Sequence, residues 1–169
     1  MMLSIRRATP DDAKSIAALM SIIAAERIHS AIDTAWTTAE QRAYMEALPE
    51  NAAIFIATAV NGQLAGLQTL ELWSALPSMR HAAQLGTFLH PDFRRQGLGN
   101  TLFAHTRAFA LNAGFTKLII QVRASNLHAQ HFYRRLGFIP CGRLHGQVRI
   151  DGVEDDEILL EMRLTPKIG

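Results

Sequence analysis

Apolar residues near the start of the chain recur with the spacing of helices. Four of them follow the i, i+3, i+4, i+7 pattern of one buried helix face: Ile16, Leu19, Met20 and Ile23. Thr9 is a suitable N-cap and Pro10 suits the first helical position, so we expect this helix to begin there. Thr37 and Glu40 have the spacing of a capping box and predict the start of a second helix.

Other segments have the pattern of strands. Apolar runs bounded by turn residues predict strands at Leu3–Arg7, Ala53–Val60, Gln63–Trp73 and Arg80–Leu89. Asn61-Gly62 predicts a two-residue hairpin turn in which both residues have positive φ. Gly86 interrupts its strand and is expected to mark a β-bulge.

Helices and strands alternate in the second half of the chain. Helices are predicted over 97–113 and Leu127–Leu136, with a buried apolar strand at Thr116–Val122 between them. Strands from Phe138 onward and over Val153–Leu164 meet at Asp151-Gly152, a second hairpin signal. This order predicts a mixed α/β sheet. The length of 169 residues suits one domain, which we expect to span residues 1–169.

The composition narrows the class of protein. With 49% hydrophobic and 19% charged residues, the chain is not of the disordered type. The formal net charge of +2 hides an uneven distribution: residues 1–89 carry a net −2, residues 90–149 a net +8 and residues 150–169 a net −4. A basic middle of this kind favours a local anionic ligand over general affinity for nucleic acid.

Cysteine content and hydropathy indicate the compartment. A single cysteine, Cys141, cannot form an internal disulfide, which fits a reducing cytosol. The longest apolar stretch, Ile16–Ala25, is too short to span a bilayer, and Met1–Pro10 contains no signal-peptide hydrophobic region. We expect a cytoplasmic protein without a membrane partner.

A basic, glycine-containing loop lies between a predicted strand and a predicted helix. It runs from Leu89 to Gly99, and its two glycines permit tight backbone conformations. Free N–H groups at the start of a helix favour an anion, and Arg94 and Arg95 add donors that suit phosphate. The loop therefore fits a pyrophosphate, the alternative being an ordinary solvated loop. It is not a Walker loop, and it lacks the third glycine of a dinucleotide fingerprint.

Two motifs in this region resemble those of a known family. Arg94-Arg95-Gln96-Gly97-Leu98-Gly99 matches Arg/Gln-x-x-Gly-x-Gly/Ala, and Asn126-x-x-Ala129-x-x-x-Tyr133-x-x-x-Gly137-Phe138 follows at the right distance. With the strand and helices between them, they make the chain similar to the GNAT superfamily of N-acetyltransferases over nearly its whole length. The resemblance implies a GNAT-like domain with a mixed central sheet of about seven strands flanked by about four helices.

The resemblance also implies roles for these residues, with acetyl-CoA as co-substrate and no metal. Residues 94–99, with Asn100 and Thr101 in the first helical turn, would bind the coenzyme pyrophosphate. Phe88 and Leu89 would lie beside the pantetheine arm, where their backbone N–H groups would polarise the thioester carbonyl as an oxyanion hole does. Asn126, in the same motif as Ala129, would hydrogen-bond the pantetheine arm.

Acetyl transfer to an amine needs an acid and a base. Tyr133 is expected near the coenzyme sulfur, where a phenol with a pKa of about 10 can donate a proton to the leaving thiolate. The alternative is a core tyrosine, as Asn126 is alternatively a simple helix cap. Glu71 is the candidate base, or else a solvent-facing strand residue. His128 and His131 share a helix face, but nothing completes a metal site.

Four residues are candidate contacts of the acceptor amine: Trp73, Gln84, Gln121 and Arg123. For each of them packing or surface exposure is the alternative. The acidic run over 149–160 resembles the ending of one branch of the superfamily that acts on small molecules, amino acids or ribosomal proteins, but it departs from that ending at Val153-Glu154. We expect the partner to be an amine-bearing small molecule or peptide.

Several functions stay open on the sequence. The first is direct transfer from acetyl-CoA to a primary amine in a ternary complex, because Cys141 lies outside both motifs and lacks a recognisable base for a covalent route. The others are a protein N-terminal acetyltransferase, a non-catalytic acyl-CoA sensor and a nucleic-acid-binding module, which is the least supported. A homodimer is a further possibility for this superfamily.

Overall fold

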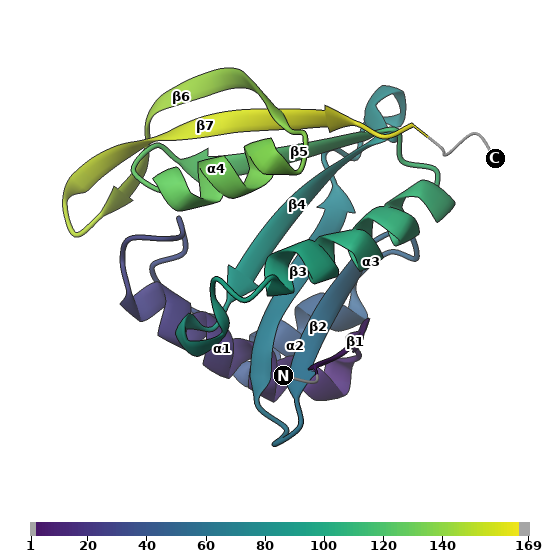
Figure 1. Ribbon diagram of the computed structural model, residues 1–169, viewed down its shortest axis with the longest axis vertical. Coiled ribbons are helices and arrows are strands. Elements are labelled where there is room, and N and C mark those ends of the chain that lie inside the picture. Colours follow the sequence, from purple (N-terminus) through teal and green to yellow (C-terminus); the bar gives the residue numbers. More distant parts are fainter. Residues whose placement is uncertain (1–2, 166–169) are drawn as a thin grey trace.

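A mixed sheet of seven strands is the centre of the structure, a computed structural model that describes residues 3–165. The strands are β1 (Leu3–Arg7), β2 (Ala53–Ala59), β3 (Leu64–Leu72), β4 (Ala82–Leu89), β5 (Lys117–Arg123), β6 (Ile139–Ile150) and β7 (Val153–Arg163). The helices are α1 (Ala13–Ala25), α2 (Thr38–Glu46), α3 (Leu98–Asn112) and α4 (Leu127–Arg135). Their arrangement confirms the predicted α/β fold class (Figure 1). Residues 1–2 and 166–169 of the predicted domain lie outside the described residues.

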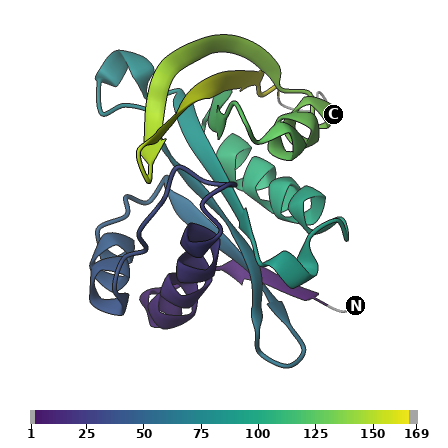
Figure 2. The ribbon, with the colours of Figure 1, turned by 90° about the vertical axis from the view of Figure 1, so that its left-hand side faces the viewer.

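The helices cover the two faces of the sheet in pairs. Buried residues of α1 and α2 pack with β2 and β3 in one core cluster, which includes Ile16, Ile23 and Met45. Residues of α3 and α4 pack on the opposite face, where Phe103, Leu118 and Leu160 form another cluster. Figure 2 shows α1 and α2 on one side of the strands and α3 and α4 on the other.

Strands β4 and β5 part in the middle of the sheet. The strand order is β1-β2-β3-β4-β5-β7-β6, and β4 and β5 are parallel neighbours. They pair only from Ala82 to Gln84, whereas β5 pairs with β7 along its full length. The second half of β4 therefore has a sheet neighbour on one side only, and Figure 1 shows it running away from β5. This parting positions the candidate site.

Local signals predicted several element boundaries correctly. Thr37 accepts from the Glu40 N–H at 3.2 Å, and the Glu40 carboxylate accepts from the Thr37 N–H at 2.8 Å, which is the predicted capping box. Asp151 and Gly152 have φ values of 51° and 80°, as the second hairpin signal required. The N-terminal segment differs slightly, because Pro10–Asp12 forms a 3₁₀ turn before α1 begins.

Three expectations about the strands are wrong. Only Gly62 has positive φ in the first hairpin, where its N–H donates to the Ala59 carbonyl at 2.8 Å and residues 60–63 form a longer loop. Gly86 marks no bulge, since the β3–β4 register is unbroken; a Cβ there would come within 2.9 Å of the Thr69 hydroxyl. Gln121 of β5 is exposed, because no helix covers that face of β5.

Candidate active site

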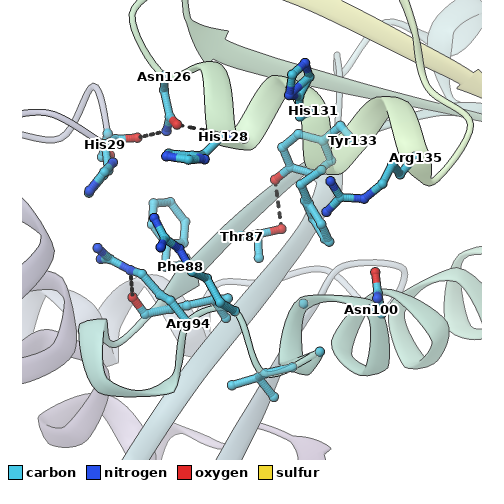
Figure 3. Close-up of a pocket in the computed structure, with 18 of the residues that line it drawn as sticks. His29, Thr87, Phe88, Arg94, Asn100, Asn126, His128, His131, Tyr133 and Arg135 are labelled. Carbon is cyan, nitrogen blue, oxygen red and sulfur yellow. Dashed lines mark hydrogen bonds between the residues drawn. The ribbon is translucent and has the colours of Figure 1, made fainter.

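A cavity of about 600 Å³ lies where β4 and β5 part. The end of β4, the loop before α3, the first turn of α3 and helix α4 form its walls, and the loop between α1 and α2 contributes His29 and Ser30 (Figure 3). Most of the predicted coenzyme residues line it: Phe88, Leu89, Arg94, Arg95, Gly97, Leu98, Gly99, Asn100, Asn126, Ala129 and Tyr133. Gln96 and Thr101 do not. The structure therefore brings the two sequence motifs together around one cavity.

The loop before α3 presents unpaired backbone N–H groups. Gly97 has φ of 82° and Arg95 has φ of 60°, so the chain makes a left-handed turn into the helix. Within residues 3–165, the N–H groups of residues 95–99 have no hydrogen-bond acceptor, whereas those of Asn100 and Thr101 donate to the Gly97 carbonyl. Five N–H groups at a helix N-terminus are suited to bind an anion. Gln96 instead donates its side-chain amide to the Asp92 carbonyl.

Gly99 is the point of contact between this loop and α4. A Cβ at this position would lie 2.9 Å from the Phe132 ring. The second glycine of the first motif therefore allows α3 and α4 to approach each other closely. The first glycine, Gly97, serves the backbone turn instead, since space beside it is open.

The Arg94 side chain is hydrogen-bonded to other groups of the protein and stabilises the loop. Its guanidinium donates to both carboxylate oxygens of Glu26 at 2.8 and 2.6 Å, and its Nε donates to the Leu89 carbonyl at 3.0 Å. These bonds lower the pKa of Glu26 below its usual range. Sequence reasoning predicted Arg94 as a direct phosphate contact and missed Glu26. Arg95 and Arg135 line the cavity and have no ion-pair partner among the residues that the structure describes.

The backbone of β4 offers N–H groups to the cavity at alternate residues. In an antiparallel pair, hydrogen-bonded and non-bonded residues alternate. The His90 N–H donates to Ala65 and the Trp73 N–H to Ala82, so Phe88 is in a bonded pair with Leu67. Thr87 and Leu89 therefore direct their N–H groups away from β3 and toward the parted strands. The predicted role of polarising the thioester carbonyl suits the Leu89 N–H. It does not suit the Phe88 N–H, which bonds to β3. The Thr87 N–H has the same direction as that of Leu89.

Asn126 has both ends of its side-chain amide engaged. Its Oδ1 caps α4 by accepting from the Ala129 N–H at 3.1 Å, and its Nδ2 donates to the His29 carbonyl at 2.9 Å (Figure 3). Arg123 donates to the carbonyl of Arg27 at 2.6 Å and pairs with Asp155 at 2.8 Å. Asn126 and Arg123 together hold the α1–α2 loop across the cavity.

Tyr133 is buried, with its hydroxyl at the cavity. Its side chain packs against Phe132 and Phe138, and its hydroxyl lies 2.8 Å from Thr87 Oγ1. Burial raises the pKa of Tyr133 to about 12. The phenol is therefore protonated throughout the neutral range, and both the side chain and the backbone of Thr87 bond to its hydroxyl.

Glu71 lies outside the cavity and on the other face of the sheet. It accepts hydrogen bonds from the Tyr44 hydroxyl of α2 and from Gln84 Nε2 at 3.5 Å. Burial raises its pKa above the usual range. Glu71 pairs with Gln84, where β4 and β5 are still joined, so it sits at the closed end of the parting. Tyr133 and Glu71 thus approach the parting from opposite faces.

The predicted acceptor contacts are dispersed, and three of the four form side-chain hydrogen bonds with other residues. None of Trp73, Gln84, Gln121 or Arg123 lines the large cavity. Gln121 donates to Glu157 at 3.1 Å, and Arg123 serves the α1–α2 loop. A smaller cavity of about 240 Å³ nearby is lined by Asp33 and Glu157 among others. Sequence reasoning did not place six further residues in the cavity: His29, Thr87, His128, His131, Phe132 and Arg135. The basic stretch pointed to Arg135, and the shared helix face of His128 and His131 was considered only for a metal.

Two observations concern other kinds of site. Across residues 3–165, no three His, Cys, Asp or Glu side chains gather closely enough to hold a metal ion. None of the helices in that range has the length and apolar character needed to cross a membrane.

Comparison with known proteins identifies the family. The sequence profile of the acetyltransferase (GNAT) family matches residues 18–138, and the chain belongs to this family. The L-amino acid N-acyltransferase MnaT of Escherichia coli strain K12 is 25% identical over 84 residues, which are 50% of this chain and 49% of that protein. Streptothricin acetyltransferase of Streptomyces lavendulae is 31% identical over 90 residues, 52% of this chain and 45% of that protein. The chain thus spans about half the length of the curated relatives it matches.

Solved structures share the fold across nearly the whole chain. A phosphinothricin acetyltransferase from Sinorhizobium meliloti, in complex with acetyl-CoA, has a TM-score of 0.89 at 19% identity and covers 100% of this chain and 95% of its own. Ribosomal-protein-alanine N-acetyltransferase from Brucella melitensis has a TM-score of 0.88 at 22% identity and covers 95% of this chain and 99% of its own. At sequence identities of 19% and 22%, the structural similarity is evidence for a shared fold alone.

Proposed function

We propose that the protein transfers an acetyl group from acetyl-CoA to the primary amine of a small molecule, directly within a ternary complex. One observation carries the proposal. The cavity of about 600 Å³ unites the unpaired N–H groups of residues 95–99 with the Tyr133 hydroxyl, which are the parts that a phosphate-bearing thioester requires.

The residues present fit the coenzyme. The loop N–H groups, Arg95 and Arg135 would hold its phosphates, and the directed N–H groups of Thr87 and Leu89 would bind its amide arm and the thioester carbonyl. For Asn126 to bind the pantetheine arm as well, its Nδ2 would have to leave the His29 carbonyl. Acetyl-CoA supplies the activated acetyl group.

Proton transfers complete the reaction. Tyr133 would donate its proton to the sulfur as the thioester bond breaks, and its high pKa keeps that proton in place until then. The amine must lose a proton as it attacks, and Glu71 is the proposed acceptor of that proton, directly or through water. Its position on the opposite face would let the amine enter from the α1–α2 side while the coenzyme enters from the α3–α4 side.

A small acceptor is favoured over a peptide by the α1–α2 loop. The loop is held across the open end of the parting by Arg123 and Asn126, which narrows the access to the space between the strands. The names of the curated relatives, an L-amino acid N-acyltransferase and a streptothricin acetyltransferase, agree with a small amine.

A panel assay tests this function. Acetyl-CoA would be incubated with amino acids, polyamines, aminoglycosides and N-terminal peptides, and thiol release would be followed with the Tyr133→Phe variant as control. Titration calorimetry with acetyl-CoA would run in parallel. Release with a small amine is the expected result. Tight binding without release across the whole panel would overturn the enzymatic proposal and favour a sensor.

A further inference from the structure

A row of three hydrogen-bonded side chains leads from the cavity into the sheet. The Tyr133 hydroxyl of α4 lies 2.8 Å from Thr87 Oγ1 of β4, and Gln68 Nε2 of β3 lies 2.8 Å from the same Thr87 oxygen. Gln68 and Thr87 face each other in the β3–β4 register. Tyr133 and Thr87 line the cavity, while Gln68 is 0% exposed.

The hydroxyl of Thr87 links the other two side chains of the row. An amide nitrogen can only donate, so Thr87 Oγ1 accepts from Gln68. The Tyr133 hydroxyl also donates to Thr87 Oγ1, so both lone pairs of that oxygen are used and the Thr87 hydrogen is left over. When a thiolate sulfur lies in the cavity, the phenol hydrogen can turn toward it while the Thr87 hydroxyl rotates to donate to the Tyr133 oxygen.

Gln68 is an unexpected residue at its position. The neighbouring strand residues Leu67 and Leu70 are buried and apolar. The Gln68 Oε1 atom is buried and has no hydrogen-bond partner among the residues that the structure describes. A buried polar atom without a partner costs stability, so an apolar residue would suit the core better. The feature that distinguishes Gln68 is the N–H that it donates to Thr87.

We propose that Thr87 and Gln68 are positioning residues that direct the Tyr133 hydroxyl proton toward the sulfur of the bound coenzyme. The inference rests on the proposed function and deepens it. During the reaction the Tyr133 O–H bond breaks and an S–H bond forms on the leaving thiolate, while Thr87 donates to the phenolate oxygen that remains. Solvent restores the proton afterwards, so no further reactant is needed.

Kinetics of variants test the positioning role. Thr87→Val removes the hydroxyl at nearly constant shape, and Gln68→Met removes the donor at similar volume. We expect kcat to fall about tenfold or more in Thr87→Val and less in Gln68→Met, with KM for acetyl-CoA nearly unchanged and most activity restored by Thr87→Ser. Thr106→Val is the control for loss of a threonine hydroxyl, because Thr106 is 0% exposed and donates to the Leu102 carbonyl within α3.

A double-mutant cycle separates this role from others. In a Tyr133→Phe background, neither substitution should lower kcat further, since the proton that they direct is gone. A loss of equal size in that background would overturn the proposal and would assign the donor role to the Thr87 hydroxyl itself. An unchanged kcat in Thr87→Val would overturn it as well. Thermal melting of each variant shows whether the fold is retained.

A second measurement is independent of turnover. The chain has two tyrosines, so Tyr44→Phe leaves Tyr133 as the single tyrosine and allows 3-fluorotyrosine labelling at one site. Titration by ¹⁹F NMR in coenzyme-free protein should show a higher phenol pKa in Thr87→Val, because the phenolate loses a donor. An unchanged pKa would overturn the positioning role even if transfer is observed. An upward shift without transfer to any amine would leave the row of bonds in place and refute the proposed function.

Discussion

The two sides of the parted sheet present different kinds of chemical groups. On the proposed coenzyme side, a short continuous segment from β4 into α3 presents backbone N–H groups, with side chains such as Arg94 and Phe132 acting as supports. On the opposite side, carboxylate and amide side chains from β3, β4, β5 and β7 bond to one another, and the Arg123 guanidinium donates to the Arg27 carbonyl of the α1–α2 loop.

This difference has a physical consequence. Backbone groups are present whatever the side chain, so the coenzyme side depends on conformation and therefore on glycine. The opposite side depends on the identity of each side chain and on the register that brings it to the parting. The first kind of site leaves a short local motif in the sequence, and the second does not.

Tyr133 provides the sharpest test of the coenzyme side. We expect Tyr133→Phe to lower kcat by about a hundredfold or more, because the phenol hydrogen is lost and the ring remains. The affinity for acetyl-CoA, measured by calorimetry, should change little, since Phe132 and Phe138 still pack against the ring. Turnover and a pH profile equal to those of the parent protein would refute the general-acid role.

Glu71 tests the opposite side through pH. A base must be deprotonated, and burial raises the pKa of Glu71, so activity should fall as pH decreases through that raised pKa. Glu71→Gln should lower kcat about tenfold at neutral pH and abolish that acidic limb. Glu46→Gln, at an exposed position of α2, is the control and should keep the limb. An acidic limb that survives in Glu71→Gln would assign the base to another group.

Substitutions at Gly99 and Gly62 compare two positions that need glycine for different physical reasons. Gly99→Ala would place a Cβ 2.9 Å from the Phe132 ring, so we expect a loss of about 1–3 kcal/mol in the free energy of unfolding, with weaker acetyl-CoA binding. Gly62→Ala meets open space but a φ of 83°, which costs about 1–2 kcal/mol and should leave binding unchanged. Denaturant titration and calorimetry measure both quantities, and equal effects on binding would contradict the separation.

The Glu26–Arg94 pair has the smallest expected effect. The folded-state pKa of Glu26 is lowered, so its stabilisation is present above the ordinary glutamate pKa and disappears as pH falls through the lower folded value. Because both side chains are partly exposed, Glu26→Gln should lower the free energy of unfolding at pH 7 by only about 1 kcal/mol, and this difference should disappear once the pH is below the lowered folded-state pKa. A difference that persists at low pH would point to packing instead of charge.

Local motifs predicted much of the fold and, in the two motifs, many of the residues that line the large cavity. The capping box at Thr37, the hairpin at Asp151-Gly152 and the spacing from Asn126 to Tyr133 each depend on residues near one another in the chain. Their geometry follows from short-range sterics and hydrogen bonding, which the sequence encodes directly.

The missed features depend on distant residues. Arg94 meets Glu26 across 68 positions and Arg123 meets the Arg27 carbonyl across 96. Gln68 reaches Thr87 only because β3 and β4 pair in one particular register. The same holds for Gly86, whose small size leaves room for the Thr69 side chain on the neighbouring strand. Its own strand contains no bulge at this position. A periodic pattern predicts that a residue is buried but not which partner it will face.

The tethers of the α1–α2 loop end on carbonyl groups. Arg123 donates to Arg27 and Ser30, and Asn126 donates to His29, in each case at the backbone oxygen. Every amino acid supplies that oxygen, so mutations at 29 and 30 can alter the side chains facing the cavity without releasing the loop. Position 27 is more restricted, because its φ of 60° favours glycine or asparagine. The loop is therefore a segment whose cavity-facing side chains can change while its tethers to Arg123 and Asn126 remain.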